Sequence, residues 1–180
     1  IADYHPEEDY RQSYTARAAL GGGVLLTQIH QIDYLNWLFG PFESVFAVGG
    51  KRSNMEIDVE DCSTYLLNGA NGIAVQGHLD YLQRPKRVSV EVMGTAGKFD
   101  WDYFGNALSF TPAKTEASSK IIQTPFDRNA MFLDCMRDFL DGIHNSARPR
   151  ADLSDGLTAL RIVDAIKESM TTHNSVRLTS

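Results

Sequence analysis

The sequence predicts an α+β fold, in which an open, mostly antiparallel sheet carries helices packed on one face. Three observations predict this fold. An amphipathic helical pattern comes early in the chain, at 24–39. Short segments of alternating polar and apolar residues follow, separated by tight turns, as in a meander of antiparallel strands. Two further helical patterns fill the last third of the chain.

The early helix is framed by glycines. Gly21, Gly22 and Gly23 precede it, and glycine can adopt positive φ and let another backbone come close. Gly40 is expected to end the helix in the left-handed conformation, because Pro41 cannot continue a helix. Apolar residues at three- and four-residue steps form the stripe expected to face the core: Leu25, Ile29, Ile32, Leu35 and Phe39.

A second stripe of the same helix carries polar residues: Thr27, His30, Asp33 and Trp37. His30 and Asp33 are three residues apart, so they lie on neighbouring turns. An imidazole beside a carboxylate is typical of a histidine that transfers a proton. The same spacing is also typical of an ordinary polar contact on a solvated helix face. Spacing alone leaves both interpretations open.

The segment before the glycines is polar and aromatic. Pro6 followed by three acidic residues favours the start of a short helix. The segment supplies the candidate substrate contacts: His5, Tyr10, Arg11 and Tyr14. These side chains could line a polar pocket, or the segment could follow the surface with half-buried tyrosine rings. The sequence leaves both alternatives open.

Strands are expected at 44–48, 58–67, 72–82, 88–92, 98–103, 107–111 and 121–122, with an edge strand at 175–178. Glycine- and asparagine-rich turns at 68–72 and 94–97 join neighbours as hairpins. The sheet face opposite the helices has apolar material to be covered by a second subunit, so we expect a homo-oligomer. Its residues are Phe46, Tyr65, Phe99 and Trp101.

Two helices are expected in the last third. The first, at 129–142, ends at Gly142 and carries an apolar face of Met131, Phe132, Cys135, Met136, Phe139 and Leu140. The second, at 152–170, begins with Asp152 or Ser154 as its cap. Its apolar face consists of Leu153, Leu157, Leu160, Val163, Ile166 and Met170.

Composition narrows the classes of function. The chain has 180 residues and a formal net charge of −6, without a basic run, so nucleic acid and anionic membranes are poor partners. No apolar run approaches the length of a membrane span. Cys62 and Cys135 lack metal-type spacing, so we expect two free, partly buried thiols and a cytoplasmic, reducing compartment. The chain begins at Ile1, and we expect it to be part of a longer protein.

Several catalytic and cofactor motifs are missing from the sequence. It contains no Gly-x-Gly-x-x-Gly between a strand and a helix, no phosphate-binding Gly-x-x-x-x-Gly-Lys, no Gly-x-Ser-x-Gly and no His-Glu-x-x-His. Gly21, Gly22 and Gly23 do not follow a predicted strand, so no cofactor-binding residue is assigned in this chain. The spacing of His30, Asp33 and His78 does not support a metal site.

Five motifs, in this order along the chain, resemble the C-terminal domain of the Gfo/Idh/MocA oxidoreductases. The central one is Gly-Gly-Gly-Val-Leu-Leu at 21–26, followed by His30-x-x-Asp33-Tyr34-Leu35-x-Trp37-Leu38-Phe39-Gly40. The others lie at 5–14, 78–85, 92–102 and 139–169, the last including Phe139-Leu140-Asp141-Gly142 and Pro149. Each motif is moderately specific, and together they cover nearly the whole chain.

The resemblance implies a fold like that of dihydrodipicolinate reductase and a two-domain dehydrogenase that uses NAD or NADP. Residues 1–180 would be its substrate-binding and oligomerisation domain, while the Rossmann domain and a catalytic lysine would lie upstream and outside this chain. The substrate would be a carbohydrate-like hydroxyl compound, namely a sugar, sugar nucleotide or cyclitol. The exposed sheet face would pack against another subunit in a dimer or tetramer, and the isolated domain would be inactive.

The resemblance also implies roles for individual residues. His30 would face the nicotinamide and take the hydroxyl proton as general base, with Asp33 orienting it. Many members carry an aspartate one turn before the histidine, where this chain has Thr27, which leaves Thr27 as a hydrogen-bonding group. Two other functions stay open: a non-catalytic sugar-binding or scaffold domain, favoured by Thr27, and a metal hydrolase that uses His30 and Asp33.

Overall fold

The computed structural model describes residues 7–115, 119–122 and 127–178. It divides into two compact units: the first combines Ile1–Leu82 with Ala151–Ser180, and the second is Gln83–Arg150. Within the described residues, each unit holds one four-stranded antiparallel sheet. The predicted α+β class with open antiparallel strands is therefore confirmed, but the single sheet expected was wrong, because the described strands divide between two sheets.

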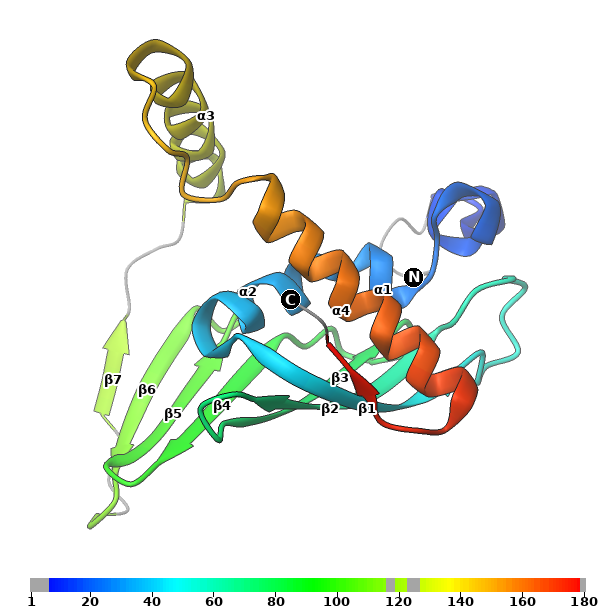
Figure 1. Cartoon of the computed structure of the whole chain (residues 1–180), viewed down its shortest axis with the longest axis horizontal. Coiled ribbons are helices and arrows are strands. Elements are labelled where there is room, and N and C mark those ends of the chain that lie inside the picture. The colour runs from blue at the N-terminus through cyan, green and yellow to red at the C-terminus, as the bar shows by residue number, and fades with distance from the viewer. Residues whose placement is uncertain (1–6, 116–118, 123–126, 179–180) are drawn as a thin grey trace. The chain divides into compact units, whose positions relative to one another are not determined.

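The first unit places its helices on one face of its sheet (Figure 1). Its sheet has the strand order β3-β2-β1-β8, with every pair antiparallel. Three short 3-10 turns precede the first helix: η1 (Tyr10–Gln12), η2 (Tyr14–Ala16) and η3 (Ala18–Leu20). The other elements are α1 (Val24–Thr27), α2 (Ile29–Phe39), β1 (Phe42–Gly50), β2 (Cys62–Gly69), β3 (Ala74–Asp80), α4 (Leu153–Thr172) and β8 (Val176–Arg177).

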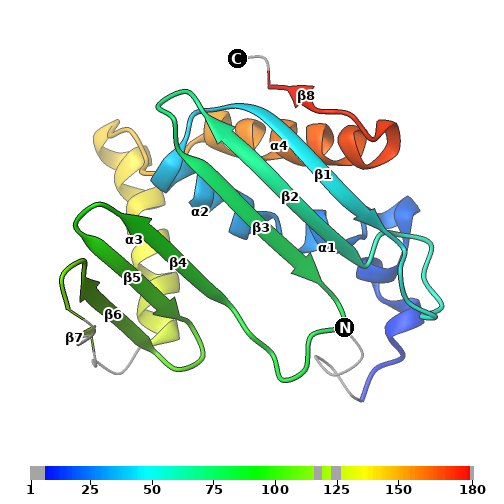
Figure 2. The same cartoon turned by 90° about the horizontal axis from the view of Figure 1, so that it is seen from below.

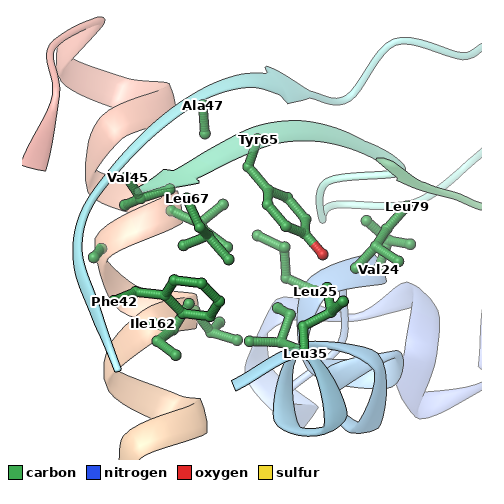
Figure 3. Packing of buried hydrophobic residues seen from close by; sticks show 14 residues of the cluster. Val24, Leu25, Leu35, Phe42, Val45, Ala47, Tyr65, Leu67, Leu79 and Ile162 are labelled. Atoms are coloured by element: carbon green, nitrogen blue, oxygen red, sulfur yellow. The ribbon is translucent and has the colours of Figure 1, made fainter. Parts of the chain in front are cut away.

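The core of the first unit lies between this sheet and its helices. It is built from Val24, Leu25, Ile32, Leu35, Phe42, Val45, Ala47, Tyr65, Leu67, Leu79, Ile162, Val163, Ala165 and Ile166. Figure 3 shows the Tyr65 ring pointing from β2 toward Leu25. Each large apolar side chain buried here contributes about 1.5–3 kcal/mol to the free energy of folding. The predicted core stripe of the early helix is confirmed, since its members are buried or half-buried in this cluster.

The position of Tyr65 corrects one prediction. We expected Tyr65 on the outer face of the sheet, yet it is only 2% exposed and lies in the core. Side chains alternate along a strand, so Tyr65 points inward and its neighbour Leu66 points outward. The outer face instead exposes Phe46, Val48 and Leu66 by 44%, 47% and 50%.

The early helix is divided in two, contrary to the single helix expected over 24–39. Gln28, with φ −108° and ψ 21°, separates α1 from α2. The Gln31 amide donates to the Gln28 carbonyl at 2.9 Å, which starts α2 as a new turn. Gly40 ends α2 as expected, but in an extended conformation with φ −73° and ψ 179°. The prediction of a left-handed cap at Gly40 was wrong, because Pro41 restricts the preceding residue to extended backbone.

Acidic side chains shorten the strand expected at 58–67, which begins at Cys62. Asp58 accepts a hydrogen bond from the amide of Ala18 at 2.6 Å. Asp61, fully buried, accepts from the amides of Arg52 and Ser53 at 2.7 and 3.0 Å. These side-chain bonds to the backbone stabilise loops in place of a strand ladder. Burial raises the pKa of Asp61, but the hydrogen bonds outweigh burial, and the net pKa is below 3.8.

The second unit contains β4 (Ser89–Gly94), β5 (Gly97–Asp102), β6 (Ala107–Pro112), β7 (Ser119–Ile122) and α3 (Arg128–Asn145). Its strands pair in chain order, β4-β5-β6-β7 (Figure 2). Phe99 packs against Phe110 across β5 and β6, with ring centroids 4.6 Å apart. Phe99 and Trp101 thus belong to a different sheet from Phe46.

The two late helices also differ from expectation. Helix α3 continues past Gly142 to Asn145, because Ser146 takes the left-handed cap position with φ 52°. No described residue of α3 is buried, so Cys135 is exposed rather than partly buried. Asp152 caps α4 as expected, in a capping box with Asp155. Three residues of its expected apolar face are exposed: Leu153, Leu157 and Leu160.

Candidate active site

The glycine turn before α1 is held by its own backbone. The amide of Gly22 donates to the Arg17 carbonyl at 2.9 Å, and the amide of Gly23 donates to the Thr15 carbonyl at 3.0 Å. The next amide, of Val24, donates to the Glu60 carbonyl at 3.0 Å. These groups are therefore already satisfied by acceptors within the chain. The turn positions α1 against the loop that carries Glu60.

The side chain of Glu60 occupies the start of α1. Its carboxylate accepts from the amide of Leu25 at 3.3 Å and lies 3.8 Å from the ammonium of Lys167. A Cβ added to Gly23 would collide with this carboxylate. A negative charge in this position favours the helix start, and it would repel a phosphate group. The described residues of the glycine turn therefore do not fit a dinucleotide phosphate.

His30 lies near the start of α2, on its exposed side. Partial burial lowers the pKa of His30 below its usual 6.5, so the neutral imidazole predominates at neutral pH. Asp33 is half-buried one turn further along the helix. Within the described part of the chain, no hydrogen bond or ion pair joins His30 to Asp33. The helix thus presents a neutral imidazole that can accept a proton.

Thr27 is joined to a tyrosine that sequence reasoning did not single out. The Thr27 hydroxyl lies 2.8 Å from the hydroxyl of Tyr81, which in turn donates to the Thr15 carbonyl at 3.2 Å. Tyr81 follows directly after β3 and is half-buried. Its segment belongs to one of the family-like motifs. Its contact with Thr27 spans 54 positions of sequence, and no local pattern predicts such a contact.

The predicted substrate contacts form a group of their own. The guanidinium of Arg11 lies 2.7 Å from Asp9 and 3.1 Å from Glu56. The hydroxyl of Tyr10 accepts from the amide of Glu56 at 3.3 Å. Tyr14 is exposed nearby in η2, while His5 and Pro6 lie outside the described residues. The structure therefore brings Tyr10 and Arg11 together at Glu56, and it joins neither of them to His30 by a hydrogen bond.

A hollow of about 420 Å³ borders α1 at Leu26. Its lining consists of Ala18, Gly22, Leu26, Gly50, Lys51, Asp58, Val59, Glu60 and Lys167, so none of the predicted site residues borders it. Across the described residues, no group of three or more histidine, cysteine, aspartate or glutamate side chains could hold a metal ion. Every helix among the described residues is too short or too polar to cross a membrane.

Comparison with known proteins identifies the class of this domain. The family model described as "Oxidoreductase family, C-terminal alpha/beta domain" matches residues 2–178. The chain is thus an oxidoreductase C-terminal α/β domain. The chain belongs to the Gfo/Idh/MocA family, as the sequence motifs predicted. No curated protein sequence matches the chain.

Solved structures share this fold. A levoglucosan dehydrogenase in complex with NADH has a TM-score of 0.85 at 18% identity, covering 96% of this chain and 55% of that one. An oxidoreductase from Agrobacterium radiobacter, in complex with NAD+, L-tartaric acid and magnesium, has a TM-score of 0.77 at 21% identity, covering 93% and 52%. An oxidoreductase from Thermotoga maritima has a TM-score of 0.74 at 19% identity, covering 91% and 49%. The chain spans about half the length of the structures it matches.

Proposed function

We propose that this chain is the substrate-binding and catalytic half of an NAD- or NADP-dependent dehydrogenase that oxidises a hydroxyl group of a sugar, sugar nucleotide or cyclitol. The observation that carries the proposal is the position of His30, whose exposed imidazole lies near the start of α2, the helix that comes after the glycine turn and α1. Burial also lowers the pKa of this imidazole. Family membership and neighbours such as a levoglucosan dehydrogenase with bound NADH support the substrate class and cofactor. We expect a Rossmann domain upstream of this chain.

His30 acts as the general base in this proposal. As the substrate carbon is oxidised to a carbonyl, its hydroxyl proton passes to a ring nitrogen of His30, which later releases it to solvent. A bound nicotinamide supplies the acceptor for the hydride from the same carbon, so one hydride and one proton leave the alcohol. We expect a segment outside this chain to hold that cofactor, since the glycine turn does not fit its phosphates.

The other predicted residues take supporting roles. Asp33 is proposed to orient His30 from the next turn of α2 once substrate is bound, and Thr27 to provide a hydrogen bond. Tyr10, Arg11 and Tyr14, together with His5, are proposed to contact the hydroxyl groups of the substrate. Two of them, Tyr10 and Arg11, are already held in place by Glu56. Such preorganisation lowers the entropy cost of binding a polar ligand.

The outer face of the first unit's sheet is proposed as the surface for self-association. Phe46 and Leu66 are cross-strand neighbours on this face, and Val48 lies two residues further along β1. All three are exposed, and a row of exposed apolar residues on a sheet is typical of an interface. A dimer or tetramer is expected, in the cytoplasm, where the two free cysteines would stay reduced.

The test uses the full-length protein with NAD or NADP and a panel of sugars, sugar nucleotides and inositols. Turnover is followed by the absorbance of the reduced cofactor. We expect turnover of at least one member of the panel, and light scattering that shows a dimer or tetramer. Saturable sugar binding without turnover would instead favour the alternative, a non-catalytic sugar-binding or scaffold domain. The Thr27 side chain, engaged with Tyr81 at a position where the family resemblance led us to expect an aspartate, is the observation that favours this alternative.

A further inference from the structure

The hydroxyl of Tyr81 lies at the centre of a hydrogen-bond chain within the first unit. It connects Thr27 at the end of α1 with the carbonyl of Thr15 in η2, at 2.8 and 3.2 Å. The same carbonyl accepts the amide of Gly23 at 3.0 Å. One side chain at the end of β3 therefore joins the lead-in segment, the glycine turn and the helix before His30.

The directions of these hydrogen bonds determine where the hydroxyl hydrogen of Thr27 is donated. A tyrosine hydroxyl has a single hydrogen, and that of Tyr81 is donated to Thr15. Thr27 must therefore donate its own hydrogen to the oxygen of Tyr81. Burial raises the pKa of Tyr81 to about 12, so the hydroxyl stays protonated at neutral pH. Thr27 can still accept a hydrogen bond from a ligand, but it cannot donate one, because its hydrogen is already donated to Tyr81.

Thr27, which donates the hydrogen bond to Tyr81, lies close to His30 in sequence. Thr27 is the last residue of α1, Gln28 interrupts the helix, and His30 is the second residue of α2. A second side-chain bond, from Gln31 to Gln28 at 3.0 Å, lies on the other side of the break. At a break the regular backbone hydrogen bonds no longer fix the direction of one helical part against the other, so that direction depends on side-chain contacts on either side. Tyr81 holds the α1 side of this break.

We propose that Tyr81 is a positioning residue for His30, acting through Thr27. The inference rests on the proposed function, in which His30 takes the proton of the substrate. It places Thr27 in the support of the base rather than in the proton transfer itself. Tyr81, which follows directly after β3, would thus affect the reaction without contacting the substrate.

The test compares variants of the full-length protein in steady-state turnover. Tyr81→Phe and Thr27→Val are each expected to lower kcat about tenfold with little change in KM, since a displaced base slows the chemical step. The double variant should lose no more than either single variant, because both remove the same hydrogen bond. Thr27→Ser should restore kcat. Tyr65→Phe is the matched control and should keep wild-type kcat, because its hydroxyl has no hydrogen bond within the described residues.

Two kinetic results would overturn the inference. One is a wild-type kcat in Tyr81→Phe, and the other is a double variant whose loss in kcat is the product of the losses in the two single variants. A failure of the proposed function is seen separately, as unchanged turnover in His30→Ala or as no turnover at all. In either case an NMR titration of the His30 ring in the full-length protein still tests whether Tyr81 positions His30. Tyr81→Phe should shift the His30 resonance and its pKa, whereas Tyr65→Phe should not. An unmoved His30 signal in Tyr81→Phe would refute the positioning role.

Discussion

The glycine turn before α1 offers a quantitative test of the fold that supports His30. Gly23 has φ 105° and ψ 151°, and a Cβ there would meet the carboxylate of Glu60. Gly23→Ala therefore adds backbone strain of about 1–3 kcal/mol and displaces Glu60 from its hydrogen bond, which costs about 1 kcal/mol more. The sum predicts a loss of about 3 kcal/mol in the stability of the first unit.

Gly21→Ala is the matched control for this substitution. Gly21 also has positive φ, at 75°, but no atom lies within 4 Å of an added Cβ. Only the left-handed backbone is penalised, at about 1 kcal/mol. Comparing the two variants thus separates the cost of a left-handed φ alone from the larger cost at Gly23, where backbone strain and the displacement of Glu60 act together.

Amide hydrogen exchange in β1 and β2 measures both effects within the first unit. Gly23→Ala should speed exchange of the slowest amides about a hundredfold, and Gly21→Ala about fivefold. Equal rates in the two variants would show that Glu60 does not occupy the space beside Gly23. That result would refute the account of the turn.

Three further predictions concern the interior of the first unit. Asp61→Asn should destabilise it by about 2 kcal/mol at neutral pH, as hydrogen bonds to Ser53 are lost. Because the folded-state pKa of Asp61 lies below 3.8, its stabilisation is complete above that pH and is lost as the pH falls through the folded pKa, so acid unfolding curves of Asp61→Asn should lack this component. Ser63→Ala should raise the free energy of unfolding in urea by about 1 kcal/mol, since the buried Ser63 hydroxyl has no partner within the described residues, and an unchanged free energy of unfolding would contradict this. Gly77→Ala should lower the thermal midpoint strongly, because its Cβ would meet the ring of Tyr65 in the adjacent strand, and wild-type stability would show that this ring can move.

Local patterns predicted most of the secondary structure. The hairpin of β2 and β3 follows from the turn at 68–72, and the cap of α4 is Asp152, one of the two residues predicted for it. Core residues of the early helix, such as Leu25 and Ile32, were predicted by their helical spacing. These features depend on residues close together in sequence, where periodicity and turn chemistry determine the conformation.

Features that depend on distant residues were missed. The break at Gln28 lies beside Thr27, whose partner Tyr81 is far away in sequence. The inward direction of Tyr65 depends on the register of β2, which one residue of slip would reverse. The family motifs supplied the role of His30, whereas its spacing to Asp33 was also typical of an ordinary polar contact on a helix face.

The most direct measurement of the central claim is the kcat/KM of His30→Ala against pH in the full-length protein, with a substrate from the panel. For the wild type, kcat/KM should rise with pH through a pKa below 6.5 and then stay level, since the base must be neutral. His30→Ala should lose about a hundredfold or more in kcat/KM together with this pH dependence. His144→Ala, on α3 of the second unit, should match the wild type. A His30→Ala variant with wild-type kcat/KM and the same pH profile would contradict the role of His30 as the base.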